Sequence, residues 1–96
     1  MSEVMNEAVA AMKEKFGNGF SAGTAKFVLE GEGAIILDGA GVREGDDEAD
    51  VTLTADPETF KAIMAGETNP TAAFMTGKLK VDGDMGLAMQ LGNTLV

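Results

Sequence analysis

The 96-residue chain contains no cysteine, histidine, tyrosine or tryptophan. Without cysteine it can form neither a disulfide framework nor a thiolate metal site. Without histidine it lacks the commonest general base and the commonest metal ligand. Its two serines, Ser2 and Ser21, lie outside any nucleophile-elbow pattern. Any catalysis would rest on carboxylates or lysines alone, so we expect a non-enzymatic protein that holds no cofactor and no metal.

Basic residues are scarce, because seven Lys and Arg stand against 16 Asp and Glu, giving a formal net charge of −9. Nucleic-acid binding needs clustered cations, and so does strong docking on anionic membranes. We therefore expect no nucleic-acid partner and at most transient membrane contact. No apolar run approaches the roughly 20 residues that span a bilayer. The acidic start is unlike a secretory signal, and the final NTLV carries no peroxisomal tripeptide, so a cytoplasmic location is expected.

Hydrophobic residues make up 45% of the chain, and this length favours a single domain over residues 1–96. Residues 2–16 predict an amphipathic helix with Ser2 as its N-cap and Gly17 as its stop. Its apolar stripe comprises Met5, Val9, Met12 and Phe16. The opposite face is mixed to acidic, unlike that of a membrane-surface helix, so we expect the stripe to pack over a sheet.

Strands are expected at 24–31, 34–39, 42–44, 51–55 and 78–82. Three successive hairpin-like connections predict that the first four form an antiparallel meander, and the fifth, which follows two helices, is free to pair differently. The near-continuous apolar run at 34–39 predicts burial on both faces. The acidic loop at 45–50 lacks the ligand spacing and central glycine of a calcium loop, so we expect it to be solvated.

Two short helices are predicted between the fourth and fifth strands. Each begins with a capping residue followed by proline, at 56–57 and 69–70, and each ends at a glycine, Gly66 or Gly77. A last helix begins after residues 83–84, and its apolar side comprises Met85, Ala88, Met89 and Leu91. This order of elements predicts an α+β fold, with a five-stranded, mainly antiparallel sheet covered by helices on one face.

Three features each leave two interpretations open. The methionines either fill an ordinary core or form the adaptable wall of a cavity. Lys78 and Lys80 point away from the side occupied by Leu79 and Val81, and they either keep a solvent face soluble or meet the head group of a ligand. Gly86 lies in a helical pattern, where it costs about 1 kcal/mol relative to alanine. It serves either close packing of the helix on the sheet or opening of the helix for ligand access.

The stretch GETNPTAAFMTGKLKVDGDMGLAMQL, residues 66–91, resembles the C-terminal signature of the sterol carrier protein type 2 family. It contains a Gly-x-x-Asn-Pro entry, an Ala-Phe-x-x-Gly-Lys-Leu-Lys core and a Gly-x-Met-Gly-Leu-Ala-Met-x-Leu end. The resemblance is specific over residues 49–91 and looser but collinear over 1–45. One departure is Asp84, where family members often have asparagine, and both residues can cap a helix.

The resemblance implies a hydrophobic tunnel between sheet and helices, and it favours the cavity interpretation of the methionines. It implies an intracellular lipid-binding or transfer domain whose ligand is a fatty acid, fatty acyl-CoA, phospholipid or sterol-like molecule. The expected lining is Phe60, Ile63, Met64, Phe74, Met75, Met85, Met89 and Leu91, with sheet support from Ile35, Leu53 and Leu79. The alternative is an accessory or regulatory module that keeps the fold without a functional cavity. A carboxylate-based hydrolase or isomerase is disfavoured because no carboxylate pair lies on an apolar face, and the oligomeric state is left open.

Overall fold

The computed structural model describes residues 3–17 and 19–95 of the chain. In order, these residues form α1 (Glu3–Lys15), β1 (Ala25–Leu29), β2 (Gly33–Asp38), β3 (Gly41–Glu44), β4 (Val51–Ala55), α2 (Pro57–Met64), α3 (Pro70–Met75), β5 (Leu79–Gly83) and α4 (Met85–Leu95). Every element predicted from the sequence is present, and each predicted end lies within two residues of the observed one, although no end was predicted for the last helix. The predicted N-cap Ser2 lies outside the described residues.

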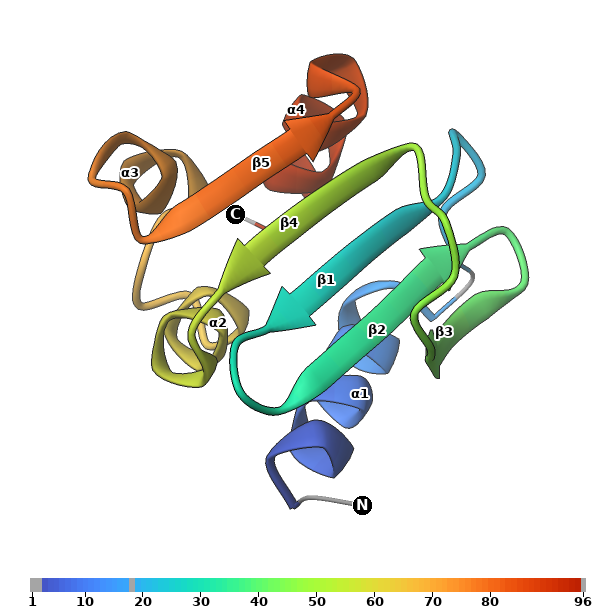
Figure 1. The fold of residues 1–96 in the computed structure, drawn as a ribbon, viewed down its shortest axis with the longest axis horizontal. Helices are drawn as coiled ribbons and strands as arrows, with labels where there is room; N and C mark the ends of the chain where they lie inside the picture. Colours follow the sequence, from blue (N-terminus) through green and yellow to red (C-terminus); the bar gives the residue numbers. More distant parts are fainter. Residues whose placement is uncertain (1–2, 18, 96) are drawn as a thin grey trace.

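The five strands form one sheet in the order β3-β2-β1-β4-β5 (Figure 1). β1 and β4 run parallel, whereas the other neighbouring strands run antiparallel. The mainly antiparallel α+β architecture is confirmed, but the predicted four-strand meander is wrong at its last step. β4 does not pair with β3; the chain crosses to the far side of β1. In that position Leu53 of β4 is level with Phe27 of β1, so the buried side chains of the two strands share one face.

The acidic loop at 45–50 makes this crossover along the face of the sheet that is turned away from the helices (Figure 1). It is held there by ion pairs, since Lys26 Nζ lies 2.9 Å from Asp46 Oδ1 and Arg43 Nη2 lies 3.7 Å from Asp47 Oδ2. Beneath the loop, Ile36 is fully buried, which confirms the prediction that β2 is buried on both faces. The loop is therefore more than a solvated segment, because it covers part of the sheet.

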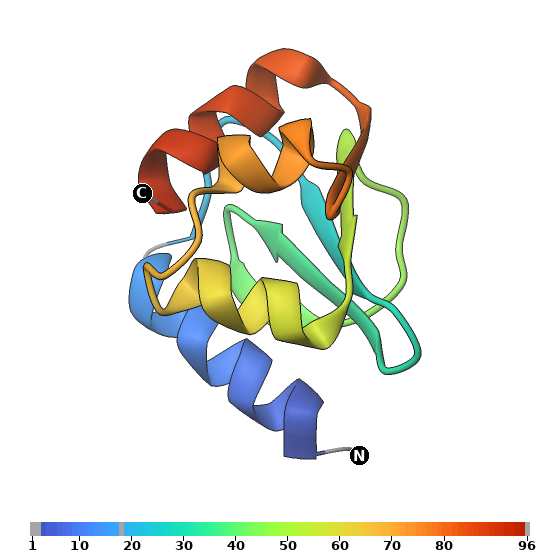
Figure 2. The same ribbon diagram turned by 90° about the vertical axis from the view of Figure 1, so that its left-hand side faces the viewer.

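All four helices lie against the other face of the sheet (Figure 2). α1 contacts α2 and α3 contacts α4, so the helices cover the sheet as two pairs. The apolar stripe predicted for residues 2–16 packs into the core, with Met5, Met12 and Phe16 almost completely buried and Val9 partly buried. None of the described helices has the length and hydropathy that a membrane crossing requires.

Candidate functional site

An apolar groove of about 290 Å³ opens between α3, α4 and the neighbouring strands β4 and β5. Its wall consists of Leu53, Pro70, Thr71, Phe74, Leu79, Val81, Met85, Ala88, Met89, Gly92 and Asn93. None of these residues is charged, and only Thr71 and Asn93 carry polar side chains. Small-molecule sites in proteins measure about 300–1,000 Å³ and are mostly apolar with a few polar groups. The groove is at the lower end of that size range and has the expected chemistry.

The first wall of the groove is α3, whose position follows from its ends. The side chain of Asn69 accepts hydrogen bonds from the backbone N–H groups of Thr71 and Ala72, at 2.8 and 3.4 Å. Pro70 and Ala73 anchor the helix through buried side chains, which leaves Phe74 only half-covered at the groove. One face of α3 is thus fixed against the rest of the protein, while Phe74 on the groove side remains partly open to solvent.

The second wall is α4, which begins where the backbone packs tightly. Gly83 has a φ of 104°, and a side chain there would collide with the carbonyl oxygen of Asp50. The next residue, Asp84, accepts a hydrogen bond from the backbone N–H of Leu87 at 3.1 Å. The predicted start at 83–84 is therefore confirmed. Asp84 caps the helix through its side chain.

α4 is apolar on two faces, where the sequence suggested one. Leu87 and Leu91 are buried in the core, with exposed fractions of 8% and 0%. Met85 and Met89 lie on the groove side and remain 49% and 69% exposed. Leu91 is two residues beyond Met89, about 200° further around the helix, so the two cannot face the same space.

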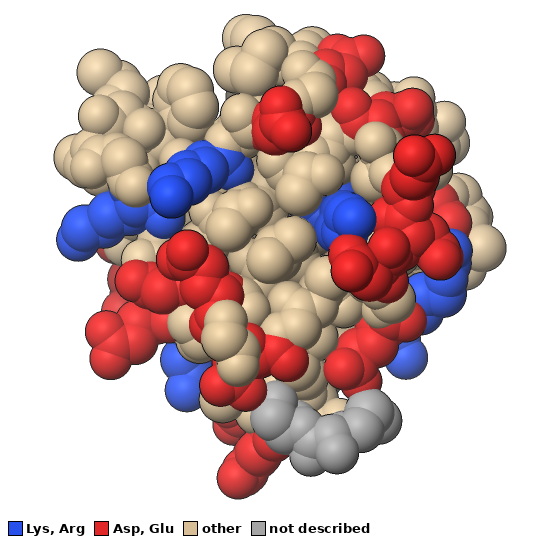
Figure 3. Space-filling model, in the orientation of Figure 1, with Lys and Arg blue, Asp and Glu red and all other residues tan. Residues whose placement is uncertain are grey.

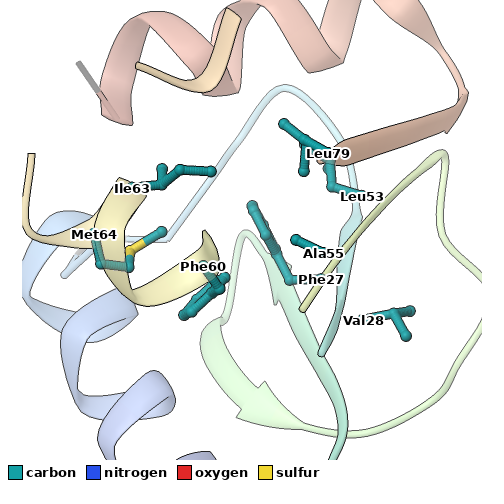
Figure 4. Close-up of a pocket in the computed structure, with 8 residues that line it drawn as sticks. All are labelled: Phe27, Val28, Leu53, Ala55, Phe60, Ile63, Met64 and Leu79. Carbon is teal, nitrogen blue, oxygen red and sulfur yellow. The ribbon is translucent and has the colours of Figure 1, made fainter. Parts of the chain in front are cut away.

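A second, inner gap lies between α2 and the sheet (Figure 4), with room of about 10 Å³. That is about the space of one water molecule. Phe60, Ile63 and Met64 of α2 line it from one side, and Val28, at its border, points away from the other labelled residues (Figure 4). Phe27, Leu53, Ala55 and Leu79 complete the lining. Leu53 and Leu79 border both hollows, so the groove and the gap are neighbours.

The predicted lining residues are thus divided among three places. Phe74, Met85 and Met89 line the groove, Phe60, Ile63 and Met64 line the inner gap, and Leu53 and Leu79 border both. Ile35 and Leu91 are fully buried in the core and line neither hollow. Met75 is 80% exposed and also lines neither hollow. The continuous tunnel implied by the resemblance remains a prediction.

Six residues of the groove were not predicted to line a cavity, namely Pro70, Thr71, Val81, Ala88, Gly92 and Asn93. The sequence could have indicated Ala88 and Gly92, because Met85, Ala88, Met89 and Gly92 recur at the three- and four-residue spacing of one helix face. No pattern in the sequence indicates Thr71 or Asn93. They become neighbours of the groove only through the packing of α3 against α4.

The perturbed carboxyl groups lie outside the groove lining. The backbone N–H of Thr59 donates to Asp56 Oδ1 at 2.6 Å and lowers the pKa of this cap of α2. A hydrogen bond from Arg43 to Asp38, at 2.9 Å, lowers the pKa of Asp38 in the same way. Both carboxylates stabilise local structure. In the described part of the chain, no group of three acidic residues is arranged to hold a metal ion.

Sequence comparison matches residues 8–96 to the family described as the SCP-2 sterol transfer family. The chain is 44% identical over 81 residues to hydroxysteroid dehydrogenase-like protein 2 of Xenopus laevis, covering 76% of this chain and 19% of that protein. It is 42% identical over 66 residues to human sterol carrier protein 2, covering 69% of this chain and 11% of that protein. The chain therefore spans a fifth or less of the length of these relatives.

Structural comparison finds the same fold in a solved structure. The fold matches the solution structure of sterol carrier protein-2 from Aedes aegypti in complex with the C16 fatty acid palmitate, with a TM-score of 0.76. The match covers 100% of this chain and 97% of that one at 24% sequence identity, so the likeness is one of fold. The family match extends over nearly the whole chain. This protein belongs to the SCP-2 sterol transfer family.

Proposed function

We propose that the groove between α3, α4 and the sheet holds the apolar chain of a single lipid and that the protein carries this lipid without reacting with it. The observation that supports this proposal is the groove itself, with about 290 Å³ of space and an uncharged wall. Burying a methylene group contributes about 0.8 kcal/mol, so a chain of about ten methylenes gains enough to bind without polar contacts. The palmitate in the mosquito protein of the same fold points to the same ligand class.

The ligand class we propose is broad, comprising fatty acids, fatty acyl-CoAs, phospholipids and sterol-like molecules. Met85 and Met89 form much of the α4 side of the groove. Methionine side chains are unbranched and flexible, so they adjust to ligands of different shape. A wall of this kind accepts several chains with similar affinity and discriminates poorly among them.

A carrier role without catalysis fits the chemistry of the groove. Its described lining contains no titratable side chain, so it offers no general acid, general base or nucleophile. The polar groups available to a ligand are Thr71 and Asn93, which donate and accept hydrogen bonds but do not titrate near neutral pH. They are suited to orienting a polar end of the lipid.

We propose that ligand exchange is limited by movement of α4. This helix contains Gly86 and Gly92, and each glycine lowers helix stability by about 1 kcal/mol relative to alanine. It also carries no charged residue, so it lacks the ion pairs that hold the acidic loop to the sheet. A local opening of α4 would widen the groove while the sheet stays intact.

The accessory-module alternative has one observation in its favour, which is the small inner gap. With room for about one water molecule, it does not accept a ligand in its present shape. A module that had lost its cavity would be filled in this manner. The two proposals differ in the groove, since only a carrier needs that space to be occupied by lipid.

The test is to purify the protein, extract it with organic solvent and identify the extracted lipids by mass spectrometry. Native mass spectrometry of the intact protein gives the stoichiometry, which we expect to be one lipid per chain. Titration with a fluorescent fatty acid should show saturable binding at micromolar concentration. If no lipid co-purifies and the fluorescent fatty acid does not bind, the carrier proposal fails and the accessory-module alternative is preferred.

A further inference from the structure

The exposed large hydrophobic side chains of the described residues lie on two helices. They are Phe74 and Met75 of α3 and Met85 and Met89 of α4, with exposed fractions of 44%, 80%, 49% and 69%. Three of the four line the groove, and Met75, the residue after Phe74 at the end of α3, does not. We refer to these four side chains as the α3–α4 patch. A contiguous apolar patch on a protein surface marks a site of interaction.

Charge is distributed unevenly around this patch. Residues 1–67 contain 14 acidic and five basic residues, whereas residues 68–96 contain two of each. The whole net charge of −9 therefore belongs to the part of the chain before α3. Neither α3 nor α4 contains a charged residue. In Figure 3, the surface over α3 is free of acidic atoms and bordered by basic ones, while acidic atoms lie over α2, over the loop at 45–50 and around the start of α4.

On the proposed function of lipid carriage, we infer that the α3–α4 patch is the surface with which the protein docks on a lipid bilayer. An acidic protein is repelled by the anionic lipids of a membrane, and this repulsion is weakest where the net local charge is zero. The exposed Lys78 and Lys80, which follow α3 in the chain, balance the charges of Asp82 and Asp84, which precede α4. The charge distribution thus leaves one orientation in which apolar side chains reach the bilayer.

The position of the groove explains why a bilayer suits this surface. The groove opens between the two helices that carry the patch. When these helices are inserted among the head groups, a lipid chain passes between membrane and groove without crossing water. Methionine and phenylalanine supply the apolar area that interfacial insertion requires. The docked protein would therefore be oriented with its binding site toward its ligand.

The other helix that could insert into a bilayer is α1, but its apolar face is packed against the protein's own core. Its side chains Met5 and Met12, and Phe16 just after its last residue, are at most 5% exposed. Its outer surface carries Glu3, Glu7 and Glu14, although Lys13 and Lys15 lie in its last turn. A helix of this kind has no apolar face left to insert, so docking is assigned to the opposite helix pair.

Met75 allows docking to be tested separately from ligand binding, because it belongs to the patch but lines neither hollow. The experiment measures co-sedimentation of the full chain with vesicles of phosphatidylcholine, alone or mixed with phosphatidylserine. Met75→Glu should weaken vesicle binding by about tenfold, since the lost apolar area corresponds to at least one tenfold step. Met75→Gln, which adds no charge, should weaken it in the same direction. The matched control Ala10→Glu places the same charge on the exposed surface of α1 and should leave vesicle binding unchanged.

Four other results would overturn the docking proposal or the carrier function. If Ala10→Glu weakens vesicle binding as much as Met75→Glu, or if neither does, the assignment to the α3–α4 patch is wrong. If the wild type binds a fluorescent fatty acid but no vesicles, the docking proposal fails while the carrier function stands. If vesicle binding follows the prediction but no fatty acid binds, the carrier function fails instead. A dimer in analytical ultracentrifugation that Met75→Glu dissociates, without vesicle binding, would assign the patch to a second copy of the chain.

Discussion

Phe27 of β1 and Phe60 of α2 meet edge to face, with ring centroids 6.1 Å apart and an interplanar angle of 73°. Both rings line the inner gap, which has room of only about 10 Å³. The larger groove lies just beyond Leu53 and Leu79, which border both hollows. If the groove holds a lipid chain as proposed, the aromatic pair is one of the contacts that keep the neighbouring gap too small to admit it.

Replacing one ring of this pair with a smaller side chain should enlarge the inner gap. Phe60→Leu removes ring atoms beside the gap, so we expect a loss of about 1–3 kcal/mol in the free energy of unfolding. We also expect the affinity to shift toward longer fatty acids, because the gap that neighbours the groove would be wider. Urea unfolding measures the first effect, and competition among fatty acids of increasing length measures the second. The control Phe74→Leu, at the exposed side of the groove, should lower the free energy of unfolding by less than about 1 kcal/mol. An unchanged preference for fatty-acid length in Phe60→Leu would contradict the idea that the ring limits depth.

The two apolar faces of α4 should respond differently to a charge. Met89→Asp places a carboxylate at the partly exposed groove wall, so it should abolish fatty-acid binding while lowering stability by less than about 1 kcal/mol. Leu91→Asp buries an unpaired charge in the core and should cost more than about 4 kcal/mol. Circular dichroism during thermal unfolding, with titration of a fluorescent fatty acid, distinguishes the two. Global unfolding of Met89→Asp would mean that this methionine is part of the packed core.

Gly83 should be far less tolerant of a side chain than an ordinary turn glycine. Its φ of 104° disfavours other residues, and a Cβ would collide with the carbonyl oxygen of Asp50. We expect Gly83→Ala to cost about 2–4 kcal/mol and to loosen the start of α4. Gly39 has open space around it and serves as the control, with an expected change of less than about 0.5 kcal/mol in Gly39→Ala. Urea unfolding measures both, and equal effects would show that the contact with Asp50 relaxes easily.

The cap of α2 should make stability depend on pH in acid. The N–H of Thr59 lowers the pKa of Asp56 below its ordinary value of 3.8, so the unfolded chain takes up this proton more readily than the folded one. The stabilisation from the charged cap is therefore present above about pH 4 and lost as the pH falls through the folded pKa. Asp56→Asn retains a capping oxygen but does not titrate. The difference in unfolding free energy between wild type and variant, measured by urea unfolding, should shrink as the pH falls below about 4. A difference that stays constant with pH would show that the charge of Asp56 does not cause the pH dependence.

The helix starts at Asp56 and Asn69 could be predicted from the sequence because capping acts within three residues along the chain. The strands were detectable for a similar reason, since the alternation of buried and half-buried side chains in β1 and β4 is a local pattern. The family could be predicted as well, because an ordered signature of 26 residues is a property of the sequence itself.

Tertiary structure alone decided which elements become neighbours. β4 pairs with β1 rather than β3 because this register places Val51 and Leu53 under the helices, a gain that depends on the whole core and not on the loop at 45–50. For the same reason, burial of Pro70 and Ala73 turns Met75 outward, and burial of Leu91 turns Met89 toward the groove. The sequence by itself determined the elements and the family, through interactions between near neighbours. The groove, its wall and its exposed rim were decided by packing between segments far apart in the chain.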